Sequence, residues 1–119
     1  MIHISIKEVY RLGRFDLSIY AEGHAGYAKP GQPDLVCAGA STLLCTMEAC
    51  LRDLEEQGGV RITQYARDAV TGLMHIEASA VTRAETISDM VRFLLTGCMM
   101  LESEYPEHVW VEYGVDEEL

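Results

Sequence analysis

The sequence predicts an α+β fold: a mixed β-sheet with two helices packed on it, in the order β-β-α-β-β-α-β. Three observations lead to this fold class. Apolar and polar residues alternate in five segments, apolar residues recur at helical spacing in two longer segments, and glycine or proline marks the boundaries. A chain of 119 residues has room for one modest core, so we expect a single domain over residues 1–119.

The first 22 residues predict a β-hairpin that turns at Gly13. The alternating apolar residues are Ile2, Ile4 and Ile6 before the turn, and Phe15, Leu17, Ile19 and Ala21 after it. This alternation is typical of strands with one buried face. Gly23 ends the second strand and opens a loop punctuated by glycine and proline.

A long helix follows the loop, with Asp34 as a favourable N-cap and Gly58-Gly59 as the stop. Its expected core-facing stripe is Val36, Ala40, Leu43, Met47, Cys50, Leu51 and Leu54. The opposite side carries the small residues Ala38, Cys45 and Ala49. A helix that is apolar over much of its circumference is buried on two sides. Either the other helix or a second copy of the protein supplies the second cover, and we expect a homodimer.

The second half predicts another hairpin, another helix and a last strand. The strands are expected over 60–65 and 73–80 around a turn at 68–72. Thr82 and Glu85 fit a capping box that begins the second helix. The stripe of this helix is Ile87, Met90, Val91, Leu94, Leu95, Cys98 and Leu101. A strand over 109–113 then precedes the acidic residues 116–118, which are most simply a solvated terminus.

The formal net charge of −10 disfavours direct nucleic-acid binding, which relies on Lys and Arg to neutralise phosphates. It favours encounter with a basic partner, or simply keeps the protein in solution. No apolar run approaches the roughly 20 residues of a membrane helix, and the first residues alternate instead of forming a signal-peptide core. We therefore expect a cytoplasmic protein.

The four cysteines, Cys37, Cys45, Cys50 and Cys98, form no C-x-x-C pair. This pattern differs from a disulfide framework and from a zinc module, so reduced thiols are expected. We interpret Cys45, Cys50 and Cys98 as packing residues inside helices.

The stretch from Gly23 to Ser41 is the candidate functional site, with His24 at the entry of the loop and Cys37 at its exit, 13 positions apart. A thiol in the first turn of a helix lies near free N–H groups that favour a thiolate and that can hold an oxyanion. If the loop brings its ends together, His24 is placed to take the thiol proton. The alternatives are a packing cysteine and a loop histidine without a catalytic task.

The other polar residues of the stretch leave several alternatives open. Asp34 either caps the helix or orients the His24 ring, as the third member of a triad does. Ser41 lies one turn after Cys37 and bonds either within the site or to the helix backbone. The glycines lack the spacing of a phosphate-binding loop. His24, Asp34 and Cys37 lack a fourth metal ligand, so no metal and no cofactor are expected.

Four pieces of this stretch, Gly23-His24-Ala25, Tyr27-Ala28, Asp34-Leu35-Val36-Cys37-Ala38 and Ser41, resemble the ribosomal-processing cysteine protease family Prp, also called YsxB-like. The likeness extends over the whole chain in length and element order. It departs from the family pattern at residues 31–34, where the loop is one residue longer.

The resemblance implies a cytoplasmic bacterial cysteine endopeptidase, usually a homodimer, that removes the N-terminal extension of ribosomal large-subunit protein 27. Carried over by position, His24 is the base and Cys37 the nucleophile. Asp34 and Ser41 match further motif positions, and the substrate-binding loop includes Gly23, Ala25 and Tyr27. We expect the loop to close on an extended peptide.

Two other readings of the same residues remain. One is a non-catalytic module that binds a basic ribosomal protein and uses the loop as a clamp. The other is a thiol-dependent hydrolase that acts on small molecules.

Overall fold

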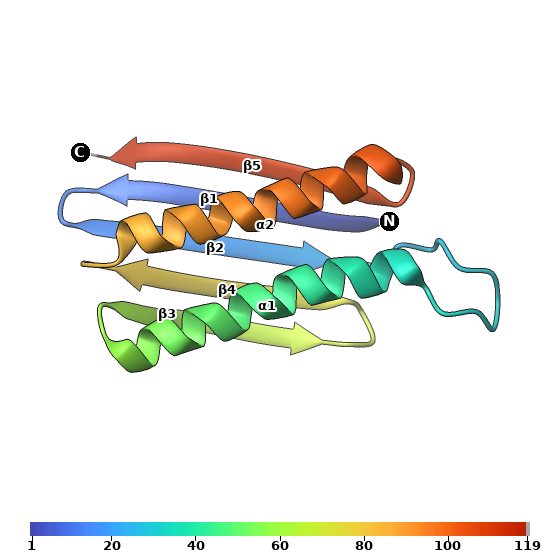
Figure 1. Cartoon of the computed structure of the whole chain (residues 1–119), viewed down its shortest axis with the longest axis horizontal. Helices are drawn as coiled ribbons and strands as arrows, with labels where there is room; N and C mark the ends of the chain where they lie inside the picture. Colours follow the sequence, from blue (N-terminus) through green and yellow to red (C-terminus); the bar gives the residue numbers. More distant parts are fainter. Residues whose placement is uncertain (119) are drawn as a thin grey trace.

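The two predicted hairpins, the two helices and the last strand assemble into one five-stranded sheet with both helices on the same face (Figure 1). The computed structural model describes residues 1–118. Its elements in chain order are β1 (Ile2–Arg11), β2 (Arg14–Glu22), α1 (Leu35–Gln57), β3 (Val60–Asp68), β4 (Leu73–Ala80), α2 (Ala84–Glu104) and β5 (Val109–Glu118). The predicted α+β class and element order are confirmed.

The sheet has the strand order β3-β4-β2-β1-β5. β5 runs parallel to β1, and the other neighbours are antiparallel, so the sheet is mixed as predicted. The acidic residues 116–118 are exposed, as predicted for a solvated terminus, but they are ordered as the end of β5. The parallel register places Asp116 and Glu118 beside Val9 and Arg11. Asp116 pairs with Lys7 at 3.5 Å and Glu118 pairs with Arg11. Basic residues of β1 thus form ion pairs with two of the three acidic residues of this segment.

One face of the sheet is covered by the helices, and this covering produces the alternation in the strands. The side chains of Ile2, Ile4, Ile6, Phe15, Leu17, Ile19 and Ala21 are all buried. Each fully buried apolar side chain of this size stabilises the fold by roughly 1.5–3 kcal/mol relative to exposure.

Glu8 is a charged residue on this covered face. It continues the alternation of Ile2, Ile4 and Ile6, so its side chain lies on the same face as theirs and is 2% exposed. Its carboxylate accepts a hydrogen bond from the Tyr113 hydroxyl at 2.7 Å and a longer one from the Tyr10 hydroxyl at 3.4 Å. Tyr10 also donates to Ser88 of α2 at 3.2 Å. Burial and the bond to Glu8 raise the pKa of Tyr113 to about 12. A buried carboxylate is thus held by hydroxyl groups and not by a salt bridge.

The buried stripe of α1 differs from the predicted one at two positions. Leu44 is buried where Leu43 was expected, and Cys50 is exposed. Leu43 instead lies between the helices, and a Cβ added to Gly97 of α2 would be 2.8 Å from one of its methyl groups. Cys45 is half-buried, so of the three cysteines interpreted as packing residues only Cys98 is fully enclosed. The α1 helix faces the sheet with a narrower stripe than its composition suggests.

The start of α2 also corrects a prediction. The helix begins at Ala84 with Arg83 as its N-cap, and no side chain caps it. Thr82 lies against Gly59, where a Cβ would overlap the threonine hydroxyl, so its side chain faces the end of α1 and not the α2 backbone. The predicted stripe of α2 is confirmed: Ile87, Val91, Leu94 and Cys98 are buried, and Met90, Leu95 and Leu101 pack against the core.

The α1 helix is 23 residues long and has the length and apolar composition of a membrane-spanning helix, so the expectation that no segment does is wrong by that criterion. It lies along the sheet (Figure 1), and 28% of its most apolar stretch is buried. The buried part belongs to the stripe that packs on the sheet. One such helix is weak evidence for a membrane span, because a helix that packs in a protein core can satisfy the same criterion.

Candidate active site

The loop between β2 and α1 begins at a tightly enclosed glycine. Gly23 has φ +91°, which L side chains rarely adopt, and a Cβ here would overlap the Met1 carbonyl oxygen. Its N–H donates to the Thr71 carbonyl in the β3–β4 turn at 3.1 Å. The entry of the loop is therefore fixed between the first residue of the chain and the β3–β4 turn.

The position of His24 follows from this anchoring. Its carbonyl oxygen accepts a hydrogen bond from the Met1 nitrogen at 2.7 Å. Its ring nitrogen Nε2 lies 2.8 Å from the carbonyl oxygen of Val70. The side chain is exposed to solvent, but both its backbone and its ring have defined partners.

Cys37 is the third residue of α1 and is half-buried. Its Sγ accepts a hydrogen bond from the Ala25 N–H at 3.1 Å. Ala25 directly follows His24, and it is 1% exposed. The loop therefore closes on itself at this point: the residue after the imidazole contacts the sulfur that lies 12 positions later.

Asp34 is the N-cap of α1, as the capping alternative predicted. Its Oδ1 accepts hydrogen bonds from Val36 N at 3.1 Å and Cys37 N at 3.0 Å, and its Oδ2 accepts from Tyr27 N at 3.0 Å. Partial burial acts to raise the pKa of this carboxyl, but the surrounding backbone N–H groups, led by that of Cys37, outweigh it and lower the pKa. Within residues 1–118 the bonds of Asp34 go to backbone N–H groups and none goes to the His24 ring.

This cap changes one expectation about the chemistry. The first turn of this helix was expected to present free N–H groups for an oxyanion, but the Asp34 carboxylate accepts from those of Val36 and Cys37. The cap is in place at the end of the helix where an oxyanion site was expected.

His24 and Cys37 line the same cavity, which has a volume of about 180 Å³. Ser41, one turn after Cys37, also lines it and is exposed. From the sheet, Arg67 and the β3–β4 turn complete the wall. The pKa of Arg67 is raised, chiefly by the sulfur of Cys45, a further lining residue. The structure thus brings together the thiol, the imidazole and the serine that the sequence singled out.

The Asp68–Gly72 turn of this wall is the part that the sequence reasoning missed. It was treated only as the connection of a hairpin. A signal is present in hindsight, because Gly72 has φ +70° and a Cβ there would overlap the Gly23 carbonyl oxygen. A glycine that allows two backbones to approach closely marks a contact and not only a turn.

The middle of the loop is held from the far side by residues after α2. The Nδ1 of His108 lies 2.8 Å from the Ala25 carbonyl oxygen, so it donates to it. The ring of Tyr27 packs edge-on against Tyr105 and His108, with centroids 5.2 and 5.5 Å apart. Residues 29–33 are exposed and project beyond the end of the sheet (Figure 1). Residues 29–33 therefore project freely, whereas His24 is held by its contacts with Met1 and Val70.

A metal site receives no support from the geometry. Among residues 1–118 no group of three or more histidine, cysteine or acidic side chains is close enough to hold a metal ion. The carboxylate of Asp34 is directed to backbone N–H groups, which is a cap and not a ligand set.

Comparison with known proteins gives consistent results. The family model described as cysteine protease Prp matches residues 1–110. The essential ribosomal processing protease Prp from S. aureus, solved with a substrate peptide, is 26% identical with a TM-score of 0.67, over 95% of this chain and 99% of that one. The same protease with a covalently linked product peptide is 24% identical with a TM-score of 0.66, over 92% and 98%.

A protein from Streptococcus mutans, SMU.848, has the same fold, with 24% identity and a TM-score of 0.61 over 97% of this chain and 95% of that one. A search of curated proteins returned no match.

Proposed function

Because this chain belongs to the cysteine protease Prp family, we propose that it is an endopeptidase whose nucleophile is Cys37 and whose general base is His24. The observation that carries this proposal is the shared cavity. The thiol and the imidazole line one recess, and the N–H of the residue after the imidazole already donates to the sulfur. A nucleophile beside a base, at the rim of an open recess, is the arrangement that acyl transfer requires.

In the proposed reaction, His24 takes the thiol proton while Cys37 Sγ forms a bond to the carbonyl carbon of the scissile peptide. The tetrahedral intermediate collapses as the C–N bond breaks, and the imidazolium gives its proton to the leaving amine. Water, deprotonated by His24, then attacks the thioester. This step releases the new carboxylate and returns the thiol. Asp34 holds the helix end that positions the sulfur, and Ser41 lines the recess beside it.

The substrate that we propose is the N-terminal extension of ribosomal large-subunit protein 27. The similar S. aureus structure is of a ribosomal processing protease with a substrate peptide bound. A net charge of −10 favours encounter with a basic ribosomal protein. Of the loop residues expected to bind the peptide, Gly23 lines the recess. Ala25 is buried and donates its N–H to the sulfur, and Tyr27 packs beside Tyr105.

The test is the intact mass of the precursor of that ribosomal protein after incubation with the enzyme. We expect the loss of an N-terminal fragment. Cys37→Ala should abolish the mass change and leave the circular dichroism spectrum unchanged. Cys50→Ala removes an exposed thiol outside the cavity and serves as the matched control, with full activity expected. Continued cleavage by Cys37→Ala refutes the assignment, and binding of the precursor without any cleavage favours the clamp module.

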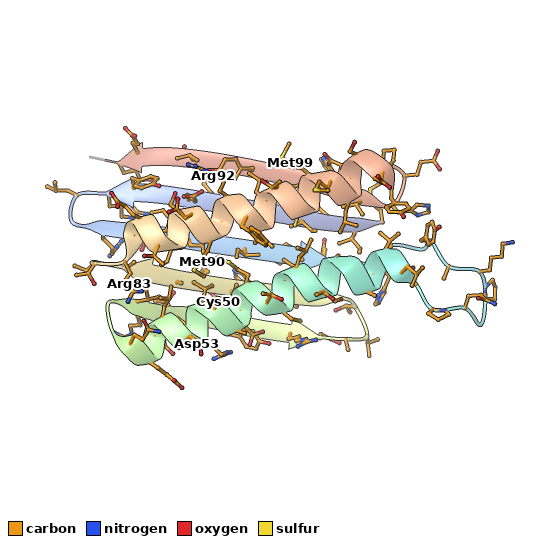
Figure 2. The ribbon with its side chains drawn as sticks, in the orientation of Figure 1. Cys50, Asp53, Arg83, Met90, Arg92 and Met99 are labelled. Atoms are coloured by element: carbon orange, nitrogen blue, oxygen red, sulfur yellow. The ribbon has the colours of Figure 1, made fainter. Side chains whose placement is uncertain are left out.

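We also propose that the protein is a homodimer that pairs through the outer surface of the two helices. This surface keeps large apolar side chains in solvent: Leu35, Phe93, Met99 and Met100 are between 52% and 75% exposed. An apolar groove of about 300 Å³ runs between the helices, with Cys50 and Met90 on facing sides (Figure 2). The small residues Ala38 and Ala49 of α1 are exposed here, which allows a second helix to approach closely.

The oligomeric state is measured by sedimentation equilibrium. We expect a dimer that Phe93→Lys converts to a monomer. Leu12→Lys changes an apolar side chain in the β1–β2 turn that is more exposed than Phe93, and it should leave the dimer intact. A monomeric wild type, or a Phe93→Lys dimer of unchanged affinity, refutes this surface.

We propose a cytoplasmic location. The four cysteines are all free thiols in residues 1–118, which suits a reducing compartment. Fractionation of cells that express the protein tests this, and recovery outside the cytoplasmic fraction would contradict it.

A further inference from the structure

The hydrogen bond of the His24 ring defines which nitrogen is available as a base. Nε2 lies 2.8 Å from the Val70 carbonyl oxygen, and a carbonyl oxygen only accepts. In the neutral ring the hydrogen is therefore on Nε2, and the lone pair is on Nδ1. A fixed tautomer of this kind is set by the partner of the other ring nitrogen.

The Val70 carbonyl is itself held in place by three contacts of the β3–β4 turn. The Asp68 Oδ1 accepts the Val70 N–H at 2.9 Å, which closes an Asx turn. The Thr71 carbonyl accepts the Gly23 N–H at 3.1 Å. Gly72 has no room for a Cβ against the Gly23 carbonyl oxygen. The Val70 side chain is 86% exposed, so this position contributes its backbone and not its side chain.

Among residues 1–118, no side chain accepts a hydrogen bond from the His24 ring as the third member of a triad would. Asp34 was the candidate from the sequence for this role, but its carboxylate accepts hydrogen bonds from backbone N–H groups of the loop and of α1. His108 donates from Nδ1 to the Ala25 carbonyl oxygen. The other titratable groups around the His24 side are Cys37 and Cys45 from α1, Arg67 and Asp68 from β3, and the Met1 nitrogen on the His24 carbonyl.

We propose that the Asp68–Gly72 turn is the third part of the active site, with the Val70 carbonyl as the group that orients His24 and Asp68 as the residue that positions this carbonyl. Nε2–H donates to the Val70 carbonyl oxygen, and Nδ1 takes the proton of Cys37. Once protonated, the imidazolium keeps the same bond, which then becomes charge-assisted and stronger. The catalytic meaning of this inference rests on the proposed proteolysis, whereas the tautomer is a property of the resting protein.

The tautomer is measured without substrate, by long-range proton–nitrogen correlation NMR on protein with isotope-labelled histidine, at a pH above the titration of the ring. Signals of His24 are identified by their loss in His24→Gln. We expect the Nε2–H pattern. An Nδ1–H pattern, or an averaged mixture of both, overturns the proposal. A protein that shows the Nε2–H pattern but never cleaves the precursor refutes the proposed function and leaves the orientation of His24 standing.

The contribution of Asp68 is tested with two variants. Asp68→Ala removes the acceptor of the Val70 N–H, so we expect a mixture of tautomers and a fall in kcat of about fivefold with KM little changed. Asp68→Asn keeps an oxygen acceptor and should restore both the tautomer and kcat. Asp53→Ala, which removes an exposed carboxylate of α1, controls for surface charge (Figure 2). If Asp68→Ala keeps the wild-type tautomer and kcat, Asp68 is not a positioning residue.

Discussion

Replacing Asp34 with alanine is the sharpest test of how the loop and α1 are joined. The substitution removes both carboxylate oxygens and with them three acceptors, which serve Val36 N, Cys37 N and Tyr27 N. The two helix N–H groups lose their side-chain acceptor. The Tyr27 N–H lies at an exposed position, where water takes over.

The magnitude follows from these contacts. Loss of an N-cap side chain costs typically about 1 kcal/mol. Loss of a negative charge at a helix N-terminus adds roughly 0.3–1 kcal/mol. The exposed bond to Tyr27 contributes little, because water satisfies the N–H group. We therefore expect Asp34→Ala to lower the free energy of unfolding by about 1–2 kcal/mol, which lowers Tm by about 5 °C per kcal/mol for a domain of this size.

The assay is urea unfolding followed by circular dichroism, with Asp34→Asn as the matched variant. Asparagine keeps one oxygen to cap the helix but lacks the charge, so its stability should lie between those of the wild type and the alanine variant. If Asp34→Ala unfolds at the wild-type urea midpoint and yet loses activity, the carboxylate acts on the chemistry and not as a cap. That result would refute the reasoning.

The remaining predictions concern stability and thiol reactivity. Because the folded pKa of Asp34 is lowered, its contribution to the free energy of unfolding is complete above the ordinary value of 3.8 and is lost as pH falls below it. A stability difference between the wild type and Asp34→Asn that stays the same in acid would contradict this. Leu51→Ala should cost 2–5 kcal/mol in urea unfolding, since the side chain is 0% exposed. Tyr113→Phe should cost about 1–3 kcal/mol, because Glu8 loses its closest donor. In native protein at about pH 8, iodoacetamide should spare Cys98, whose burial raises its pKa to about 11; peptide mass mapping measures this.

Much of the fold was predictable because each element carries its own period. The alternation around Gly13 and the stripe of α2 depend on local spacing, and both are correct. The errors fall where tertiary contacts decide. Whether Leu43 or Leu44 enters the core depends on where α2 lies, since both fit a helical stripe. Glu118 belongs to a strand only because Arg11 lies beside it in a parallel pair, which local composition does not reveal.

The candidate site was predictable only in its side chains. His24 and Cys37 are conspicuous at the two ends of a loop rich in glycine and proline, and the structure places them on one cavity. The Val70 carbonyl carries no residue signature, because every residue has one. It meets His24 because β4 pairs with β2, so the turn before β4 comes to the end of β2. Strand order of this kind is a property of the whole sheet and not of any segment.

The pairing of the first strand with the last has a consequence for synthesis. As the chain leaves the ribosome, β1 can pair with β2 almost at once. The opposite edge of β1 stays unpaired until β5 has emerged more than 90 residues later. During that interval the edge presents unsatisfied backbone groups beside a row of isoleucines, which invites pairing with another nascent chain. Rapid overproduction should therefore favour inclusion bodies, and slower translation at low temperature should favour native protein.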